Sequence, residues 1–178
     1  MKSFKNVSSI KQIPVSRIIQ TPSFITNPSI NINSYTYYNS LTQIQKDSLL
    51  WLGGGNNVNT GGPVIVYGTS VWGFKTPFPS GTQCVGIQAN SFIERSIFLV
   101  AKTYTLSFSY NTRSGSSANS VILLIDNVSI GSLPTVSSSV WKVFSLPFTV
   151  TVDKLVVVRF LGGTTIDATT GINDITIT

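Results

Sequence analysis

Residues 77–110 read PFPSGTQCVGIQANSFIERSIFLVAKTYTLSFSY and contain three short apolar segments separated by turns. In the last segment the large side chains and the hydroxyl side chains alternate strictly. A repeat of two is the side-chain period of a β-strand, and this alternation is typical of an antiparallel strand with one face on a core and one in water. The core face of this strand is predicted to carry Tyr104, Leu106, Phe108 and Tyr110.

Strand-like segments continue on both sides of this region. Asp126-Asn127 predicts a hairpin turn, and a Val-Asp-Lys turn at 152–154 predicts that the strands on either side of it pair with each other. Around ten short strands, with turns every eight to twelve residues or so and no long helix, predict an all-β antiparallel sandwich. The other expected elements are strands at 24–38, 49–52, 64–67, 121–125, 128–130, 141–149, 155–160 and 172–177, with a helical turn within 39–48.

The chain of 178 residues is long enough for one domain with a sizeable core. Only 10% of its residues are charged, against about a quarter in an average domain. Because serine, threonine and asparagine supply the polar surface instead, the composition is that of an all-β protein. We assign residues 23–178 to the sandwich and residues 1–22 to a basic, extended N-terminal arm.

The arm contains four of the 12 basic residues and none of the six acids. Pro14 and Pro22 interrupt any helix in it, which leaves two alternatives: an extended segment lying on another surface, or a partly disordered tail. An extended arm could pair with the sheet edge of a neighbouring protein through main-chain hydrogen bonds. The residues expected to take part are Lys2, Lys5, Ile10, Lys11, Ile13, Val15, Arg17 and Ile18.

Several functional classes are disfavoured by the residue inventory. With no histidine, the chain cannot form a serine–histidine triad or a histidine-ligated metal site. Its one cysteine, Cys84, can form neither an internal disulfide nor a thiolate cluster, and its apolar neighbours predict a buried thiol. Glycoside hydrolysis needs two carboxyl groups facing across a sugar, and the few acids lie mostly in turns. We therefore predict a protein that is not an enzyme.

Localisation signals are sparse. The first 20 residues lack the continuous apolar region of a secretory signal peptide, and no run reaches the ~20 apolar residues of a membrane span. The sandwich region is nearly neutral, and four basic residues in the arm are fewer than a nucleic-acid-binding surface usually carries. We expect synthesis in a cytoplasm, no transmembrane segment and no nucleic-acid partner.

In this order, the elements resemble the galactose-binding-like jelly-roll domains that include many carbohydrate-binding modules. The resemblance covers residues 23–178 and implies a jelly-roll fold. Similar domains occur in large DNA viruses as well as in bacteria. The matching residues are Phe24, Pro28, Trp72, Pro79–Gln83, Ile87, Gln88, Tyr104–Phe108, Ile125–Asn127, Trp141, Phe148, Thr149 and Ile172–Ile175.

The resemblance also bears on metal binding. The first strand of such domains often has a glutamate that ligates structural calcium, and here Ile25 stands near that position and cannot ligate. Asp174 could still offer a carboxylate, but calcium takes six to eight oxygen ligands. We therefore expect no cofactor, with Asp174 as the one candidate calcium ligand.

Sugar binding needs an aromatic ring for the C–H face of a pyranose and amide or hydroxyl groups for its hydroxyls. The loop that begins at Trp72 could provide such a platform. The alternative is that Trp72 plugs one end of the sandwich, as buried aromatic rings commonly do. The candidate carbohydrate-binding residues are Trp72, Phe74, Phe78, Gln83, Gln88 and Asn90.

Two functional classes follow. The first is a structural component of an assembly, such as a minor capsid or surface protein of a virion, whose arm contacts other protein subunits. The second is a carbohydrate-binding module that recognises glycans through the Trp72 loop. The absence of a signal peptide and of an attached catalytic domain favours the first class.

Overall fold

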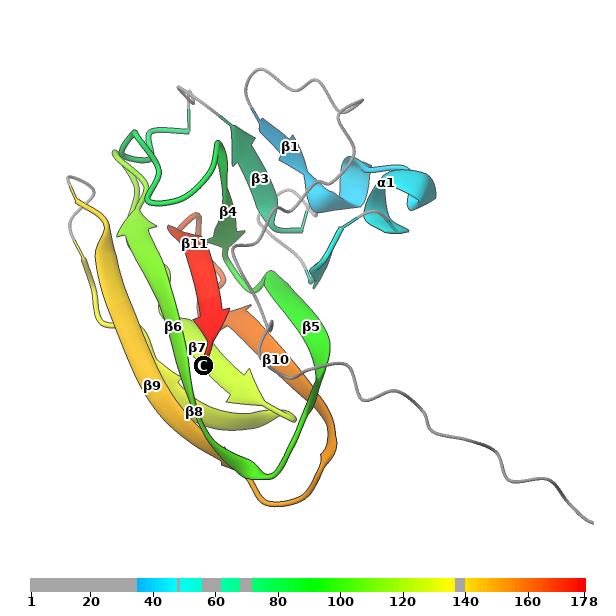
Figure 1. Cartoon of the computed structure of the whole chain (residues 1–178). Coiled ribbons are helices and arrows are strands. Elements are labelled where there is room, and N and C mark those ends of the chain that lie inside the picture. The colour runs from blue at the N-terminus through cyan, green and yellow to red at the C-terminus, as the bar shows by residue number, and fades with distance from the viewer. Residues whose placement is uncertain (1–34, 48, 56–61, 68–71, 137–139) are drawn as a thin grey trace, which may run out of the picture.

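The computed structural model describes residues 35–47, 49–55, 62–67, 72–136 and 140–178. Two antiparallel sheets face each other, as the sequence predicts (Figure 1). In spatial order, the six-stranded sheet consists of β1 (Tyr35–Tyr37), β3 (Val64–Tyr67), β4 (Gln83–Gln88), β11 (Thr169–Ile177), β6 (Lys102–Thr112) and β9 (Lys142–Val150). The five-stranded sheet consists of β2 (Leu52–Gly54), β5 (Phe92–Leu99), β10 (Lys154–Gly162), β7 (Val121–Ile125) and β8 (Val128–Ser132).

The core lies between the sheets and is built from the alternating side chains of the strands. The four residues predicted for the core face of β6 are all buried. Phe108 meets Phe160 of the opposite sheet edge to face, with ring centroids 4.9 Å apart. The cross-strand neighbour of Phe108 is Phe144 of β9, which packs against the same core. Aromatic contacts within and between the sheets therefore hold this part of the sandwich together.

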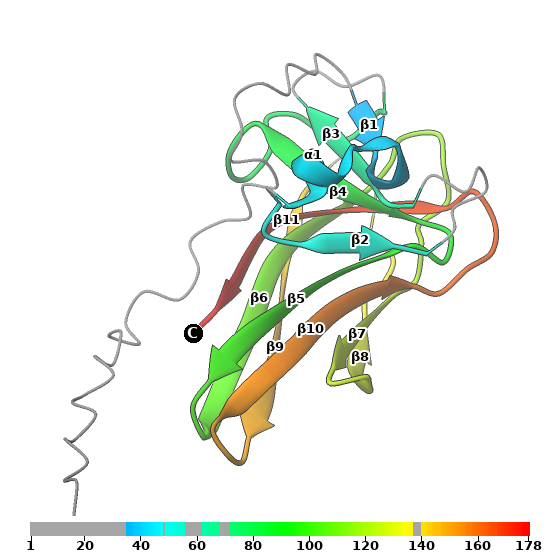
Figure 2. The same ribbon diagram turned by 90° about the vertical axis from the view of Figure 1, so that its right-hand side faces the viewer.

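The prediction that the strands around the Val-Asp-Lys turn pair with each other is wrong. β9 pairs with β6 in one sheet, whereas β10 pairs with β5 and β7 in the other. Figure 2 shows β9 and β10 in different layers, joined at one end. The short turn carries the chain across the core, so two consecutive strands bury their apolar faces from opposite sides. The connections from β4 to β5 and from β5 to β6 also change sheets.

Other local predictions are confirmed. Asp126 and Asn127 have φ values of 50° and 65° and join β7 to β8, which is the two-residue turn of a right-twisted hairpin. The expected helical turn is present as η2 (Tyr38–Ser40) and α1 (Gln43–Asp47). Cys84 is buried, and burial raises the pKa of its thiol. None of the described helices is long and apolar enough to cross a membrane.

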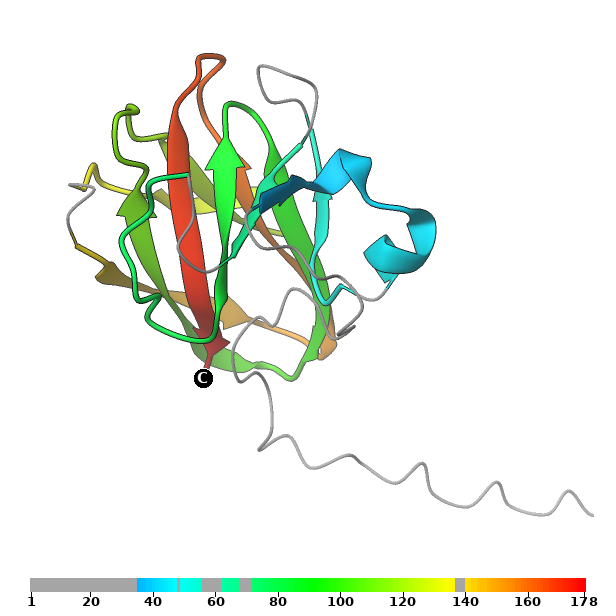
Figure 3. The same ribbon diagram turned by 90° about the horizontal axis from the view of Figure 1, so that it is seen from above.

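The N-terminal predictions have a mixed outcome. β1 matches only the end of the strand expected at 24–38, and the arm lies outside the described residues. The strand expected at 49–52 begins only at Leu52, and Trp51, directly before it, is buried in the core. Seen from above, β1 and the helical turn lie at one side of the sandwich (Figure 3).

Candidate functional site

The aromatic loop after β3 lies on the outer face of the six-stranded sheet. The side chains of Trp72, Phe74 and Phe78 are only 5%, 5% and 8% exposed. They form a second apolar cluster with Val64, Val66 and Cys84, which is separate from the core between the sheets. The rings are therefore covered, as the plug alternative expects for Trp72, but they lie on the outer face of the sheet and do not close an end of the sandwich. Little of the ring surface is left on which a sugar could stack.

Polar contacts fix the same loop to the sheet. Trp141 Nε1 donates a hydrogen bond to the carbonyl oxygen of Lys75 at 2.6 Å. Further along, Asn173 Oδ1 accepts from the amide of Ser80 at 2.9 Å, and Asn173 Nδ2 donates to the carbonyl oxygens of Ser80 and Gln83 at 3.0 and 2.7 Å. Because Asn173 is 2% exposed, these bonds are shielded from water and hold the loop closely.

Three other predicted residues are not part of the aromatic cluster. Gln83 shares the inner side of β4 with Val85, and its Oε1 is buried without a partner among the described residues. Asn90 is exposed in the turn between β4 and β5. Asp174 adopts a left-handed backbone conformation, with φ 54°, where the register between β11 and β6 shifts. In the described part of the chain, no three Asp, Glu, Cys or His side chains gather, so a calcium role for Asp174 stays a prediction.

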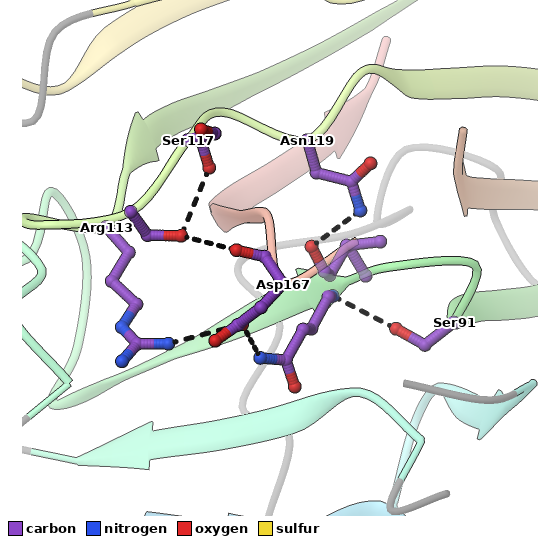
Figure 4. Close-up of polar contacts among 8 residues, drawn as sticks. Ser91, Arg113, Ser117, Asn119 and Asp167 are labelled. Atoms are coloured by element: carbon purple, nitrogen blue, oxygen red, sulfur yellow. Dashed lines mark hydrogen bonds and ion pairs between the residues drawn. The ribbon is translucent and has the colours of Figure 1, made fainter. Parts of the chain in front are cut away.

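Trp72 and Gln88 are linked by a chain of contacts through Arg113 and Asp167. The sequence analysis did not single out either of these two residues. The Arg113 guanidinium lies over the Trp72 ring, with its Cζ 4.5 Å from the ring centroid. Arg113 Nη1 is 3.6 Å from Asp167 Oδ1, and Gln88 Nε2 donates a hydrogen bond to the same oxygen (Figure 4). The carboxylate is thus held from two sides and remains half-exposed, with 56% of the side chain accessible.

Strand order explains why these residues meet. Gln88 ends β4, Arg113 directly follows β6, and Asp167 lies just before β11. β11 runs between β4 and β6, with Thr169 opposite Gln88. The three side chains therefore reach the same end of the six-stranded sheet from three neighbouring strands.

Asn119 holds the adjoining loops in place. Its Nδ2 donates to the carbonyl oxygens of Ile87 and Ala89 at 3.0 and 2.6 Å, and its Oδ1 accepts from the amide of Gly163 at 3.2 Å. The residue is 2% exposed, so its hydrogen bonds connect the β4–β5 turn, the segment before β7 and the segment after β10 in a site shielded from water, and it acts as a buried bracket between them. A rigid support of this kind keeps Gln88 and Asp167 in register.

Tyr35 provides an exposed ring beside this cluster. Its ring centroid is 5.4 Å from that of Trp72, and 39% of the residue is accessible. We call Tyr35, Trp72, Arg113, Asp167 and Gln88 the loop-end cluster. It offers a ring, a cation and a carboxylate at the surface, which is a set suited to hydrogen bonding and ring stacking. The sequence signal for Arg113 and Asp167 was weak, because each is a single charged residue just outside a strand.

No known family model matches this chain, and no curated protein sequence matches it. Among solved structures, the xylan-binding CBM22-1 domain of Xyn10C from Paenibacillus barcinonensis is similar, with a TM-score of 0.52 and 11% sequence identity over 80% of this chain and 90% of that domain. The CBM22-1–CBM22-2 tandem domain of the same protein matches with a TM-score of 0.52 and 10% identity, over 80% of this chain and 43% of the tandem.

At these identities the likeness concerns the fold alone. The sandwich described above and these matches agree with the resemblance carried by the sequence motifs. The chain has the galactose-binding-like jelly-roll fold found in carbohydrate-binding modules.

Proposed function

We propose that this protein is a non-catalytic carbohydrate-binding module and that its binding site is the loop-end cluster. The observation that carries the proposal is the position of an exposed ring, Tyr35, next to Trp72 and the oriented Arg113–Asp167 pair. Sugars are bound by such combinations, because their C–H faces pack on aromatic rings while their hydroxyls need fixed donors and acceptors.

Each residue has a distinct role in this proposal. The Tyr35 ring packs against the face of a pyranose. Asp167 accepts hydrogen bonds from sugar hydroxyls, and Arg113 donates to a hydroxyl or ring oxygen. The sequence analysis proposed Trp72 as the stacking platform. Here its role is indirect: its buried ring packs against Tyr35 and Arg113 and holds both in position. A site held this rigidly loses little conformational entropy on binding.

The non-catalytic part of the proposal rests on the residue inventory. Asp167 is the one carboxylate in the loop-end cluster, and it is bound to Arg113 and Gln88. A guanidinium group donates hydrogen bonds but does not give up its proton in proteins, so an arginine is a poor acid–base catalyst. The cluster therefore has no pair of groups for acid–base work on a glycosidic bond.

A glycan array tests this proposal. The wild-type protein should bind one or more glycans, and Tyr35→Ala and Asp167→Ala should each weaken binding at least tenfold with the fold intact by circular dichroism. Phe98→Ala is the matched control, since Phe98 is 57% exposed on the other sheet and should be dispensable. No binding by the wild type, or unchanged binding by both site variants, would overturn the proposal.

The assembly role remains a second proposal. It rests on the concentration of basic residues in the first 20 positions, which suits an arm that contacts other subunits. The similar structures named above lend no support to a virion protein made in a host cytoplasm. The two roles are compatible if the protein displays a glycan-binding domain on the surface of a particle.

A further inference from the structure

The described part of the chain contains two arginine–carboxylate pairs, which differ in geometry. The pair on the five-stranded sheet is closed. Arg159 Nε of β10 donates a hydrogen bond to Glu94 Oε2 of β5 at 2.7 Å, and Arg159 Nη2 contacts the same oxygen. The two residues lie opposite each other in the strand register, and only 23% of the Glu94 side chain is exposed. This is the arrangement expected of a structural cross-strand ion pair.

The Arg113–Asp167 pair of the loop-end cluster is open by comparison. Arg113 Nη1 and Asp167 Oδ1 are 3.6 Å apart, which is longer than a hydrogen bond. The Asp167 side chain is 56% exposed, more than twice as much as that of Glu94. Because the contact is loose, the guanidinium keeps N–H donors for another acceptor, and the carboxylate keeps lone pairs for another donor.

The contacts of the Asp167 carboxylate with the described residues are on one of its two oxygens. Gln88 Nε2 donates a hydrogen bond to Oδ1, which is also the atom that faces Arg113. A carboxylate has about four lone-pair sites, shared between its two oxygens. Oδ2 is therefore left as an acceptor for a ligand, and the exposure of the side chain makes it accessible from solvent.

The two charged residues are held next to each other by a serine and a tryptophan. The Ser116 amide donates to the carbonyl oxygen of Arg113 at 3.3 Å, and Ser116 Oγ donates to the carbonyl oxygen of Asp167 at 3.0 Å. The Trp72 ring supports the guanidinium, whose Cζ lies 4.5 Å from the ring centroid. A donor group and an acceptor group are thus fixed side by side (Figure 4). Binding a ligand to such a preorganised pair costs little conformational entropy.

We propose that a sugar hydroxyl binds between Asp167 and Arg113, and that the loop-end cluster thereby selects uncharged saccharides over acidic ones. This inference rests on the carbohydrate-binding function proposed above and names the ligand class of that site. A hydroxyl both donates and accepts, so it can donate to Asp167 Oδ2 and accept from Arg113 at the same time. The carboxylate of a uronic acid can only accept, and it is negatively charged.

Asp167 is the residue that makes this distinction. Its side chain is more exposed than that of Arg113, at 56% against 29%, so an approaching ligand meets the carboxylate before the guanidinium. Juxtaposed like charges at a binding interface act against the wrong ligand. The net charge of the whole chain predicts the reverse preference, because +6 attracts acidic glycans at long range. A preference for uncharged sugars would therefore be a local property of this site.

The opposite preference has a definite structural form. An acidic saccharide could displace Asp167 from Arg113 and pair with the guanidinium itself, since guanidinium–carboxylate pairs form strong hydrogen bonds. The site would then bind acidic sugars more tightly than neutral ones. The experiment below treats this result as one that overturns the inference.

The test is a titration of the full-length protein followed by ¹H–¹⁵N NMR. The probes are three pairs of sugars that differ only at C6: glucose and glucuronate, galactose and galacturonate, and mannose and mannuronate. The Trp72 indole resonance reports on the site, and that of Trp51, in the core between the sheets, is the internal control. At least one neutral sugar should shift the Trp72 resonance saturably, and its acidic partner should bind at least tenfold more weakly.

Two variants assign this selectivity to a residue. Asp167→Asn keeps the shape of the side chain and removes its charge, so the difference between the two members of a pair should shrink to less than threefold. Glu94→Gln is the matched control, because it removes the carboxylate of the closed pair on the other sheet. This control should keep the tenfold difference. Circular dichroism checks that both variants are folded.

Three results would overturn the inference: equal or tighter binding of the acidic sugars, an unchanged tenfold preference in Asp167→Asn, or no response of Trp72 to any of the six sugars. A failure of the carbohydrate-binding function itself is a different result, namely no binding by the wild type on the glycan array. A protein that binds neutral and acidic glycans equally well would keep the proposed function and lose the selectivity inferred here.

Discussion

The ring of Phe74 lies directly on Gly171, so closely that a Cβ atom at this glycine would come 2.7 Å from the ring Cε1. Gly171 pairs with Gly86 of β4, and a Cβ at Gly86 would be 3.4 Å from the same ring. Because neither glycine has a side chain, the Phe74 ring can pack directly on the backbone of the outer face of the sheet. The aromatic loop is therefore closely packed against this face.

Gly171→Ala should destabilise the protein, because the added methyl group pushes Phe74 out of its position. Overpacking of this kind costs about 1–3 kcal/mol. Urea unfolding measures the change, and Ser96→Ala, at an exposed position of β5, is the control with an expected change under about 0.5 kcal/mol. Equal stability of Gly171→Ala and the wild type would show that the loop can move away freely.

Trp72→Ala should act on stability rather than on binding alone. The ring is 5% exposed and packs against Tyr35, Tyr37 and Arg113, so its removal should cost about 3 kcal/mol. Tyr35→Ala removes a partly exposed ring and should cost about 1 kcal/mol. Thermal unfolding of the two variants side by side measures the difference. A larger loss for Tyr35→Ala would contradict these assignments.

Asn119→Ala should lower the free energy of unfolding by about 3 kcal/mol, because it leaves the carbonyl oxygens of Ile87 and Ala89 without their buried donor. Asn90→Ala is the matched control, since Asn90 is exposed in the neighbouring turn and should change stability by less than about 0.5 kcal/mol. Chemical denaturation of both variants tests this. Similar losses in the two would rule out a bracket role for Asn119.

The stability of the β7–β8 hairpin should depend on pH in the acid range. Asp126 Oδ2 is 2.7 Å from Lys154 Nζ, and the Val157 amide donates to Asp126 Oδ1 at 2.8 Å. The hydrogen bond from Lys154, with help from that of Val157, lowers the pKa of Asp126 below its usual value. The stabilisation is therefore complete above the unfolded pKa of about 3.9 and is lost as the pH falls through the folded pKa.

Urea unfolding between about pH 6 and pH 2 measures this dependence. Asp126→Asn should be less stable at pH 6 and should lose less stability on acidification than the wild type. Both partners are partly exposed, so solvent screening keeps the difference small. An unchanged pH profile in Asp126→Asn would contradict the prediction.

Deletion of residues 1–22 tests the role of the arm. We expect the melting temperature to change little, because in the described part of the chain both sheets and the core between them are formed by residues from Tyr35 onward. If the arm mediates assembly, the truncated protein should no longer be incorporated into the larger particle. Normal incorporation would remove the basis of the assembly proposal.

Local patterns were sufficient for most strands and turns after residue 63, and less so for the N-terminal strands. The alternation in β6 correctly identified its core face, and Asp126-Asn127 identified a hairpin turn. Such patterns say which face of a strand is apolar, but not which strand lies beside it. For that reason the pattern around the Val-Asp-Lys turn predicted that β9 pairs with β10. In the structure the chain crosses the core between these two strands, which belong to different sheets.

The sequence by itself determined the fold class, because strands with a period-two apolar pattern need a cover, and a chain with no long helical segment can supply that cover only from further β-structure. It also directed attention to Trp72 and Gln88. Only the tertiary structure decided that the Trp72 ring is a covered support and that Gln88 meets Asp167, 79 residues away in the chain. These relationships arise from contacts between distant segments, which no local pattern encodes.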